Sequence, residues 1–583
     1  MMMASVIELT RLALRNLARH RVKTILTIAA VSISVGVYII MDGWIMGMNI
    51  DSLRNIANFE IGAAKLQTKA YYDKKDELPM YENFGGWEQS AAALDEAGYD
   101  CAPRFVFTGT IYSETASAPM VFIGCDPVAE ARVLHYPKYI ESGRFIRKGA
   151  FELVLGAVTA DKLKVGIPQR PTVDELEQDI LPNLPAEKRD FVRGLYEKAP
   201  VKSGGLYAPQ EAAPSRPGEE RWVLKKNTLP QDMERYWKLL AEAGRMNVQI
   251  STVIDIKAAP ESVRKEKFEV DLAPVLSSEE MELFHRMYQF DELTQAWYLD
   301  SGDETLEASV LAAMVRVDYA GAIRHVNQLI SAVVVGVVNS PNPKTNNNTA
   351  WIPLDVLQDE TGLMLEGRVT ELLIRIKNAD NTKVPGEDEG PEAIKAAMAE
   401  MAIAGAASTL PAALPEELDI FSWEGYVQDY IAAARGDNVS YQVIIVVLFI
   451  LSFMGIANTM LLAILERTRE AGMMRAMGMT DGQLIGIYMM EAGMVGFFGS
   501  LIGILLGCLI NIPMVKYGLD FTAMTESMGG DIGYRLTGVF RSAWNIPVII
   551  GSGIIAPILA SCMAFFPTRR ALKMPITESL RFE

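Results

Sequence analysis

The sequence predicts an α-helical membrane protein with four transmembrane helices and a large α+β extracytoplasmic domain. Hydrophobic residues make up 50% of the 583 residues, and they are concentrated in windows close to the length of about 20 residues that crosses a bilayer. The four windows cover residues 24–45, 442–465, 484–510 and 546–566. A long stretch, residues 46–441, separates the first two windows and mixes strand-like with helix-like segments, which is typical of an α+β domain.

Basic residues set the expected orientation. They precede the first window and follow the last: Arg11, Arg15, Arg19, Arg21 and Lys23, then Arg569, Arg570, Lys573 and Arg581. Because cytoplasmic segments are enriched in Lys and Arg, we expect both termini, residues 466–483 and the tail 567–583 inside, with residues 46–441 and 511–545 outside. Residues 1–23 are either an amphipathic interfacial helix or a simple topology signal. The first window is expected to be an uncleaved signal-anchor.

The formal charge of −17 must reside mainly in the expected outer region. An acidic outer domain argues against nucleic acid or anionic lipid as its ligand. Cys101 and Cys125 flank an expected hairpin there, so a disulfide and two buried free thiols both remain open. Without zinc-like spacing, and with four scattered histidines, we expect no metal site.

The connector between the second and third windows, residues 466–483, combines a soft apolar surface with cations. Met473, Met474 and Met477 recur at helical spacing, and thioether side chains adapt to a partner surface. Thr480 followed by Gln483 predicts a capping box that starts the next helix. The connector is therefore either a docking element for a partner protein or a basic loop held inside by topology alone.

Three stretches, in the right order, resemble FtsX-like permeases, the MacB and LolC/LolE type of ABC transporter subunit. They are ERTREAGMMRAMGM at 466–479, PTRRALKMPITESLRFE at 567–583 and RLALRNLARHRVKTILT at 11–27. The resemblance implies that the connector couples to an ATPase. The residues it assigns to that role are Glu466, Arg467, Arg469, Glu470, Gly472, Met473, Arg475 and Gly478.

The outer region divides into an expected core, residues 50–168 and 325–440, and an insertion, residues 169–324. Phrases in the core resemble the family's MacB-like periplasmic core, whereas the insertion shows no match. Helical composition is expected at 173–180, 232–243 and 278–297 within the insertion. The insertion is either a packing or lid subdomain or a site for cargo or a partner, and Phe290, Trp297 and Tyr298 are the aromatic candidates for that site.

Small residues and prolines mark the expected helix contacts. Gly499, Gly503 and Gly507 lie four apart and form a small-xxx-small face, suited to packing within the subunit or to dimerisation. Pro557 can kink the fourth span. Ionisable residues such as Asp42 and Glu491 are few, which argues against a chemiosmotic carrier and favours structural pairing.

The 583 residues contain no G-x-x-x-x-G-K-[ST] motif and no recognisable hydrolase or metalloprotease motif, so neither ATP hydrolysis nor other catalysis is expected of them. The resemblance implies a non-catalytic permease at the bacterial inner membrane that works by mechanotransmission and binds no cofactor. Its implied partners are a LolD-like ABC ATPase, a second permease of the same or homologous sequence, membrane lipid, and a periplasmic adaptor or lipoprotein cargo.

Lipoprotein release is the first expectation for its function, and export of a lipid, peptide or drug is the next. Two rivals remain open. One is an FtsX-like transmembrane regulator of a cell-wall hydrolase, and the other is an outer enzyme merely tethered by its spans.

Overall fold

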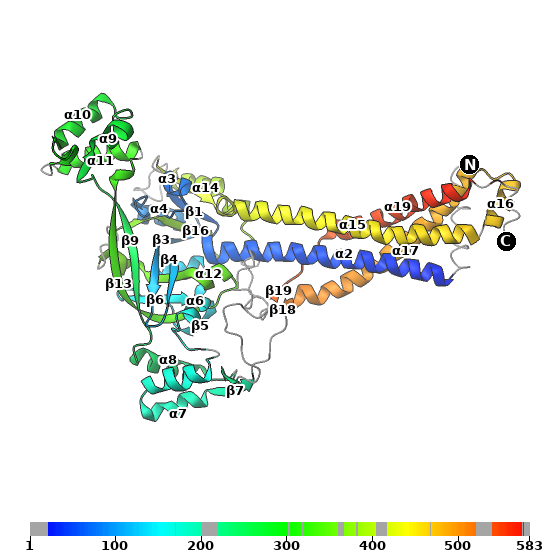
Figure 1. The fold of residues 1–583 in the computed structure, drawn as a ribbon, viewed down its shortest axis with the longest axis horizontal. Helices are drawn as coiled ribbons and strands as arrows, with labels where there is room; N and C mark the ends of the chain where they lie inside the picture. Colours follow the sequence, from blue (N-terminus) through cyan, green and yellow to red (C-terminus); the bar gives the residue numbers. More distant parts are fainter. Residues whose placement is uncertain are drawn as a thin grey trace. The chain divides into compact units, whose positions relative to one another are not determined.

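The computed structural model describes residues 21–168, 171–200, 220–225, 227–300, 304–317, 319–359, 367–379, 383–403, 417–466, 468–520, 539–573 and 575 (Figure 1). The chain divides into two compact units. The helical unit comprises Met1–Leu53, Val427–Glu526 and Ile532–Glu583, and the sheet unit comprises Arg54–Tyr426 and Ser527–Asp531. Of the expected amphipathic segment 1–23, only residues 21–23 are described, and of the tail 567–583 only residues 567–573 and 575 are described.

Long helices build the helical unit. They are α2 (Arg21–Ile56), α15 (Gln428–Glu466), α17 (Asp481–Lys516) and α19 (Ile546–Ala571), with the short α16 (Thr468–Ala476) and the strand pair β18 (Leu519–Asp520) and β19 (Val539–Phe540) between them. Among the described residues, three helical stretches are long and apolar enough to cross a membrane: Thr24–Ile61, Asp481–Lys516 and Ile546–Ala571. Helix α15 covers the remaining window, but many of its apolar side chains lie outside the description, so the fourth span stays a prediction.

Each helix extends beyond the hydrophobic window that predicted it. Helix α2 continues past residue 45 through the polar sequence DSLRNI, and α15 begins well before residue 442. Hydropathy detects only the apolar centre of a helix, whereas backbone hydrogen bonding continues into polar flanks. Helix α2 thus carries the chain from the helical unit into the sheet unit, where the π-helical turn η1 (Ala57–Ile61) ends it.

Valines, isoleucines and alanines form the core of the helical unit. Its fully buried members are Val31, Val35, Ile39, Ala492, Val495, Ala556, Ala560 and Ala564. Three of them, the alanines of α19, recur every four residues and are 0% exposed. Small side chains at this spacing let helix backbones approach closely.

A ten-stranded mixed sheet organises the sheet unit. Its order is β17-β1-β16-β3-β4-β14-β6-β13-β5, and β9 pairs with β13 and β3. The strands are β1 (Ala64–Thr68), β3 (Tyr99–Tyr112), β4 (Ser117–Cys125), β5 (Ile140–Gly143), β6 (Glu152–Gly156), β9 (Asn247–Lys257), β13 (Ile323–Val338), β14 (Thr349–Pro353), β16 (Glu371–Ile376) and β17 (Leu418–Ser422). The pairs β13–β6 and β14–β4 are parallel. The predicted β3–β4 hairpin is confirmed.

Both faces of the sheet are covered, so its central strands are apolar on both sides. Phe122 lies in the larger core and its neighbour Ile123 in the smaller one, as the period of two requires. The covering helices are α3 (Lys69–Asp73), α4 (Trp87–Glu96), α5 (Pro127–Val133), α6 (Ala157–Lys162), α12 (Pro343–Asn348), α13 (Leu354–Asp359) and α14 (Pro391–Ile403). Short turns η2 (Tyr136–Tyr139), η7 (Glu387–Glu389) and η8 (Trp423–Tyr426) and the pair β2 (Phe84–Gly85) and β15 (Arg368–Val369) complete this part.

The expected insertion, residues 169–324, has three structural parts. The first joins the large core and contains η3 (Glu175–Ile180), η4 (Leu181–Asn183), α7 (Ala186–Gly194), β7 (Tyr196–Pro200), β8 (Glu220–Leu224) and α8 (Pro230–Glu242). The second is strand β9, which belongs to the main sheet although it lies inside the expected insertion. Long-range strand pairing of this kind leaves no local pattern in the sequence.

The third part, the distal lobe, lies between β9 and β13 and has its own core (Figure 1). It contains β10 (Ser262–Arg264), α9 (Lys265–Lys267), η5 (Phe268–Leu272), α10 (Ser278–Met287), β11 (Tyr288–Asp291), β12 (Ala296–Leu299), α11 (Glu304–Arg316) and η6 (Ala320–Ala322). The expected helix at 278–297 is wrong beyond Met287, because the chain there forms the β11–β12 hairpin. Asp291 accepts hydrogen bonds from the amide of Leu293 and the hydroxyl of Thr294, which favours a turn over a helix.

Candidate functional site

The connector, residues 466–483, folds as helix α16 followed by a tight turn into α17. Gly478 has a φ of +96° just after α16, a conformation that favours glycine at a helix C-terminus. The Thr480 side chain accepts a hydrogen bond from the Gln483 amide, and the Gln483 side chain accepts one from the Thr480 amide, so the predicted capping box forms. Gly478 thus has a local conformational role in shaping the connector.

One side of α16 packs inward. Ala471 is 4% exposed and forms a small cluster with Leu484 and Tyr488 of α17 and with Leu572, which follows α19. Met474 packs partly buried against the same cluster. The connector is therefore held on the ends of two long helices and is not a free loop.

The opposite side of α16 presents methionines. Met473 is 45% exposed and Met477 is 80% exposed, in contrast to half-buried Met474. The methionines expected to act together are thus divided, and two of the three face outward. Methionine side chains that are exposed at helical spacing suit binding to a partner groove.

The charged residues of the connector differ in their surroundings. Arg475 places Nε 2.9 Å from Oδ1 of Asp481, and its side chain is 15% exposed, so it ties α16 to the first turn of α17. Arg469 is exposed and Glu470 is half-buried, whereas Gly472 is buried in α16. Glu466 ends α15 with a side chain outside the description, and Arg467 lies outside the described residues.

The glycine stripe of α17 packs against α2 within the chain. A Cβ built on Gly499 would lie 2.7 Å from Cβ of Val31, and one on Gly503 would lie 2.6 Å from the carbonyl oxygen of Ser32. A Cβ on Gly507 would lie 3.1 Å from a carbonyl oxygen of α2. The Ser32 hydroxyl also donates a hydrogen bond of 2.9 Å to the Gly499 carbonyl. Close backbone approach along this seam requires residues without a side chain.

Two further small-residue contacts escaped the sequence analysis. A Cβ on Gly496 would lie 2.8 Å from Cβ of Ala560 and 2.9 Å from Cα of Pro557, so the expected kink residue lies in the α17–α19 contact. A Cβ on Gly47 of α2 would lie 2.1 Å from the carbonyl oxygen of Arg541. In the sequence, these contacts could have been predicted from small residues spaced four apart: the alanines of α19, and Gly43 with Gly47.

The ionisable residues in these helices have local surroundings. Asp42 accepts a hydrogen bond of 2.8 Å from Asn545, and Glu491 is 6% exposed within α17. The described part of the chain shows no group of three or more His, Cys, Asp or Glu residues that could hold a metal ion. The helical unit therefore offers packing surfaces and the connector as its candidate functional features.

In the sheet unit, the cysteines are unpaired. Arg104, not Cys101, lies opposite Cys125 in the β3–β4 register, and the two cysteines pack into cores on opposite faces of the sheet. Burial raises the pKa of both thiols well above the usual value. Of the two alternatives, the structure has free thiols, with Cys125 buried and Cys101 half-buried.

The aromatic residues of the insertion mostly face one another. The Trp297 ring lies 5.4 Å from Phe268 and 5.0 Å from Phe290, measured between centroids, and it packs against the core of the distal lobe. Only Tyr298, at 42% exposure, presents a large surface among the three expected candidates. This arrangement favours a packing role for Trp297 and Phe290.

Residues 442–576 match the family described as FtsX-like permease C-terminal. This segment contains most of α15, all of α16, α17 and α19, and the connector. The chain is 31% identical over 140 residues to the ABC transporter permease YtrF of Bacillus subtilis, and 30% identical over 129 residues to a protein named Uncharacterized ABC transporter permease MJ1507 of Methanocaldococcus jannaschii. It is 25% identical over 146 residues to the macrolide export ATP-binding/permease protein MacB of Nitrobacter winogradskyi.

These similarities are confined to part of each protein. The matched residues cover 23%, 22% and 25% of this chain, and 30%, 29% and 20% of the three relatives in the same order. They support a permease region of FtsX/MacB type. They do not test the expected closer resemblance to LolC/LolE.

Proposed function

We propose that this chain is the membrane subunit of an ABC transporter of FtsX/MacB type, with four spans and both ends in the cytoplasm. The observation that carries the proposal is the connector: it lies within the matched residues 442–576, is held rigidly by a buried cluster, and turns Met473 and Met477 outward. A rigid element with an adaptable apolar surface suits a partner that pushes on it.

The partner we propose is a separate ABC ATPase of LolD type, with a second permease copy or homologue completing the complex. The 583 residues contain no P-loop motif that could cradle nucleotide phosphates. By contrast, the MacB relatives are named ATP-binding/permease proteins. In this proposal the chain binds no cofactor, and ATP is bound by the partner.

The proposed mechanism is mechanotransmission at the bacterial inner membrane. Movement of the ATPases would displace α16, shift the long helices, and move the sheet unit, which would lie outside. The chain enters the sheet unit through α2 and returns through α15, so these two helices are the covalent routes for such movement. The proposed cargo is a lipoprotein released from the membrane, with a lipid, peptide or drug as the next class, handed to a periplasmic adaptor or carrier.

Docking of the ATPase can be tested separately from folding of the connector. Met473→Ser and Met477→Ser remove exposed apolar surface. Each should weaken recovery of a co-purified ATPase by roughly ten-fold or more, because a methionine buried at the interface contributes about 1.5–3 kcal/mol. Arg475→Glu should also weaken it, but that change sets a carboxylate beside Asp481 and disturbs the connector itself. Leu293→Ser, at a 96% exposed site in the distal lobe, is the matched control. Equal ATPase recovery from the methionine variants and the unsubstituted chain would contradict docking at this surface.

A second candidate function is that of a transmembrane regulator of a cell-wall hydrolase, and the FtsX-like match is compatible with it. The same motion would then switch an enzyme and release no cargo. The two functions differ in what the full chain retains in mild detergent. An acylated protein bound to it supports release, whereas a bound hydrolase supports regulation.

A further inference from the structure

The first long helix, α2, ends in residues that belong to the sheet unit. Helix α2 is followed by η1, and the amide of Gly62, with a φ of +77°, closes it by donating to the Ala57 carbonyl at 3.0 Å. The last carbonyl groups of a helix lack partners within the helix and must find donors elsewhere. Phe59 is 3% exposed and Ala57 is 0% exposed, so water does not supply those donors freely.

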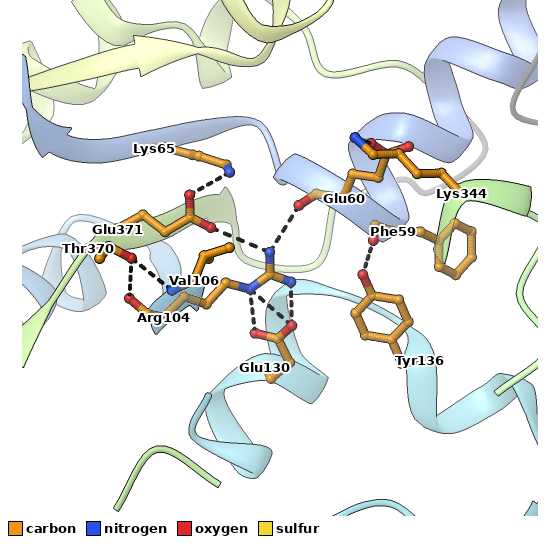
Figure 2. Close-up of polar contacts among 10 residues, drawn as sticks. All are labelled: Phe59, Glu60, Lys65, Arg104, Val106, Glu130, Tyr136, Lys344, Thr370 and Glu371. Carbon is orange, nitrogen blue, oxygen red and sulfur yellow. Dashed lines mark hydrogen bonds and ion pairs between the residues drawn. The ribbon is translucent and has the colours of Figure 1, made fainter. Parts of the chain in front are cut away.

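Side chains of the sheet unit supply further donors, one of them to the Ala57 carbonyl that also accepts from the Gly62 amide. Arg104 of β3 donates from Nη1 to the Glu60 carbonyl at 3.0 Å, and Arg375 of β16 donates from Nη1 to the Ala57 carbonyl at 3.3 Å. The Tyr136 hydroxyl donates to the Phe59 carbonyl (Figure 2). Cations at a helix C-terminus also interact favourably with the helix dipole. The carbonyl groups at this helix end therefore accept hydrogen bonds from side chains of the sheet and of η2.

Arg104 is the central residue of this group of contacts. It is 1% exposed, and its Nε lies 3.1 Å from both carboxylate oxygens of Glu130, which is fully buried. Its Nη1 lies 3.6 Å from Oε1 of Glu371 (Figure 2). Burial alone would lower the pKa of Arg104, but Glu130 and Glu371 hold it above its usual value. The guanidinium thus stays charged and uses its fork to join a helix end, α5 and β16 at once.

The Glu60 side chain extends the network from the helix. Its carboxylate accepts a hydrogen bond of 2.6 Å from Nδ2 of Asn342 and forms an ion pair with Nζ of Lys344 at 3.0 Å. On the other side of Arg104, Glu371 lies 2.6 Å from Nζ of Lys65 in β1. Cations and carboxylates alternate through the cluster, which suits a site removed from solvent.

Lys65 brings the second helix junction into contact with the same network. Its ammonium lies 4.8 Å from the centroid of the Tyr426 ring, at the end of η8 and directly before the chain leaves the sheet unit. Burial lowers the pKa of Lys65, against the opposing effect of Glu371. Strands β1 and β17, which follow the first junction and precede the second, pair antiparallel from Ala64 opposite Ser422 to Thr68 opposite Leu418.

Stability alone does not explain this arrangement. Replacing a buried ion pair by well-packed apolar residues is often neutral or stabilising. A buried arginine that donates to a backbone carbonyl fixes geometry as well as charge. The planar guanidinium fork lets Arg104 donate to the Glu130 carboxylate and to the Glu60 carbonyl at the same time. Within the sheet unit, these contacts fix the position of η1 against β3, β16 and η2.

We propose that Arg104 is a positioning residue that anchors the end of the first helix to the outer sheet, so that movement of this helix reaches the sheet through the Arg104, Arg375 and Tyr136 contacts. The transmission part rests on the proposed function. The anchor itself is a property of the folded chain, independent of any ATPase.

The anchor is tested by amide hydrogen exchange of the full chain in lipid nanodiscs. In Arg104→Lys the ammonium keeps the charge beside Glu130 but lacks the fork, so exchange at residues 57–62 should rise on the order of ten-fold while β3 and β4 keep their protection. Tyr136→Phe, which changes no charge, should produce a smaller rise at the same residues. Arg144→Lys, in the partly exposed pair with Glu152, is the control and should leave residues 57–62 unchanged. Normal exchange at 57–62 in both Arg104→Lys and Tyr136→Phe would overturn the anchor.

Transmission is tested with the co-purified ATPase present, by comparing exchange across the sheet unit with and without ATP. In the unsubstituted chain, ATP should change exchange in the sheet unit. Arg104→Lys should keep the ATPase rate and lose at least half of that change. An equal response in Arg104→Lys would overturn transmission through Arg104. An unsubstituted sheet unit that ignores ATP would overturn the proposed function and the transmission role, while the first experiment still judges the anchor.

Discussion

The substitution Gly503→Ala tests whether close backbone contact holds α17 against α2. A methyl group at this position would lie 2.6 Å from the Ser32 carbonyl oxygen and 2.8 Å from Cβ of Val35. Non-bonded carbon atoms prefer about 3.5–4.0 Å, so the two helices must separate by roughly 1 Å, which forfeits a quarter to a half of the dispersion energy at the contact. The obstructing atoms are backbone and a Cβ, which cannot rotate away.

The expected magnitude follows from two opposing effects. Overpacking of this kind costs about 1–3 kcal/mol, whereas alanine in a helix gains about 0.5–1 kcal/mol over glycine. Gly503→Ala should therefore destabilise the chain by up to about 2.5 kcal/mol. Gly507→Ala should cost less, because its nearest neighbours lie at 3.1–3.2 Å and can yield slightly. Gly486→Ala on the same helix meets nothing within 4 Å and should stabilise.

Equilibrium unfolding of the full chain in mixed micelles, by titration with a denaturing detergent, measures the three variants. The expected order of stability is Gly486→Ala, then Gly507→Ala, then Gly503→Ala. If Gly486→Ala destabilised the chain as much as Gly503→Ala, the effect would belong to helix α17 itself, and the packing argument would fail.

Two smaller predictions concern helix ends. Thr480→Ala removes the acceptor for the Gln483 amide and should cost about 1 kcal/mol at the start of α17, seen as faster amide exchange there, while Thr480→Ser retains protection. In the distal lobe, the hydrogen bond from Arg316 lowers the pKa of Glu280 from its usual 4.5 to about 2. Because the folded pKa lies below the unfolded one, the contribution of this pair is complete above about pH 5 and is lost as pH falls toward 2. A carboxyl titration by NMR should place the pKa of Glu280 near 2 in the unsubstituted chain and higher in Arg316→Gln, where only the Ser277 hydrogen bonds still lower it. An unchanged midpoint in that variant would refute the pairing.

Elements that carry a local signal were predictable from the sequence. The Thr480 capping box depends on residues three apart, and the β3–β4 hairpin depends on adjacent apolar runs with turn residues between them. The long helices were found as apolar windows, but their ends were not, because the polar flanks of α2 and α15 carry no hydropathy signal.

Features that depend on distant residues were not predictable. Strand β9 was assigned to the insertion, although it pairs with β13 over eleven residue positions from Asn247 to Lys257. The helix expected across residues 278–297 failed where the β11–β12 hairpin begins, since helical composition outweighed the aromatic residues and the Asp291 turn. Arg104 carried no signal at all, because a single arginine within an apolar strand does not reveal that a helix end meets it.

The arrangement of the two junctions limits how movement could be transmitted. Strands β1 and β17 are hydrogen-bonded neighbours, and β-strands in a sheet lie about 4.8 Å apart. The chain segments that follow α2 and precede α15 are therefore joined by the hydrogen bonds between β1 and β17, and β1 is buried along its whole length. Under the proposed function, movement of either helix would reach this strand pair first, because β1 follows α2 and β17 precedes α15 along the chain.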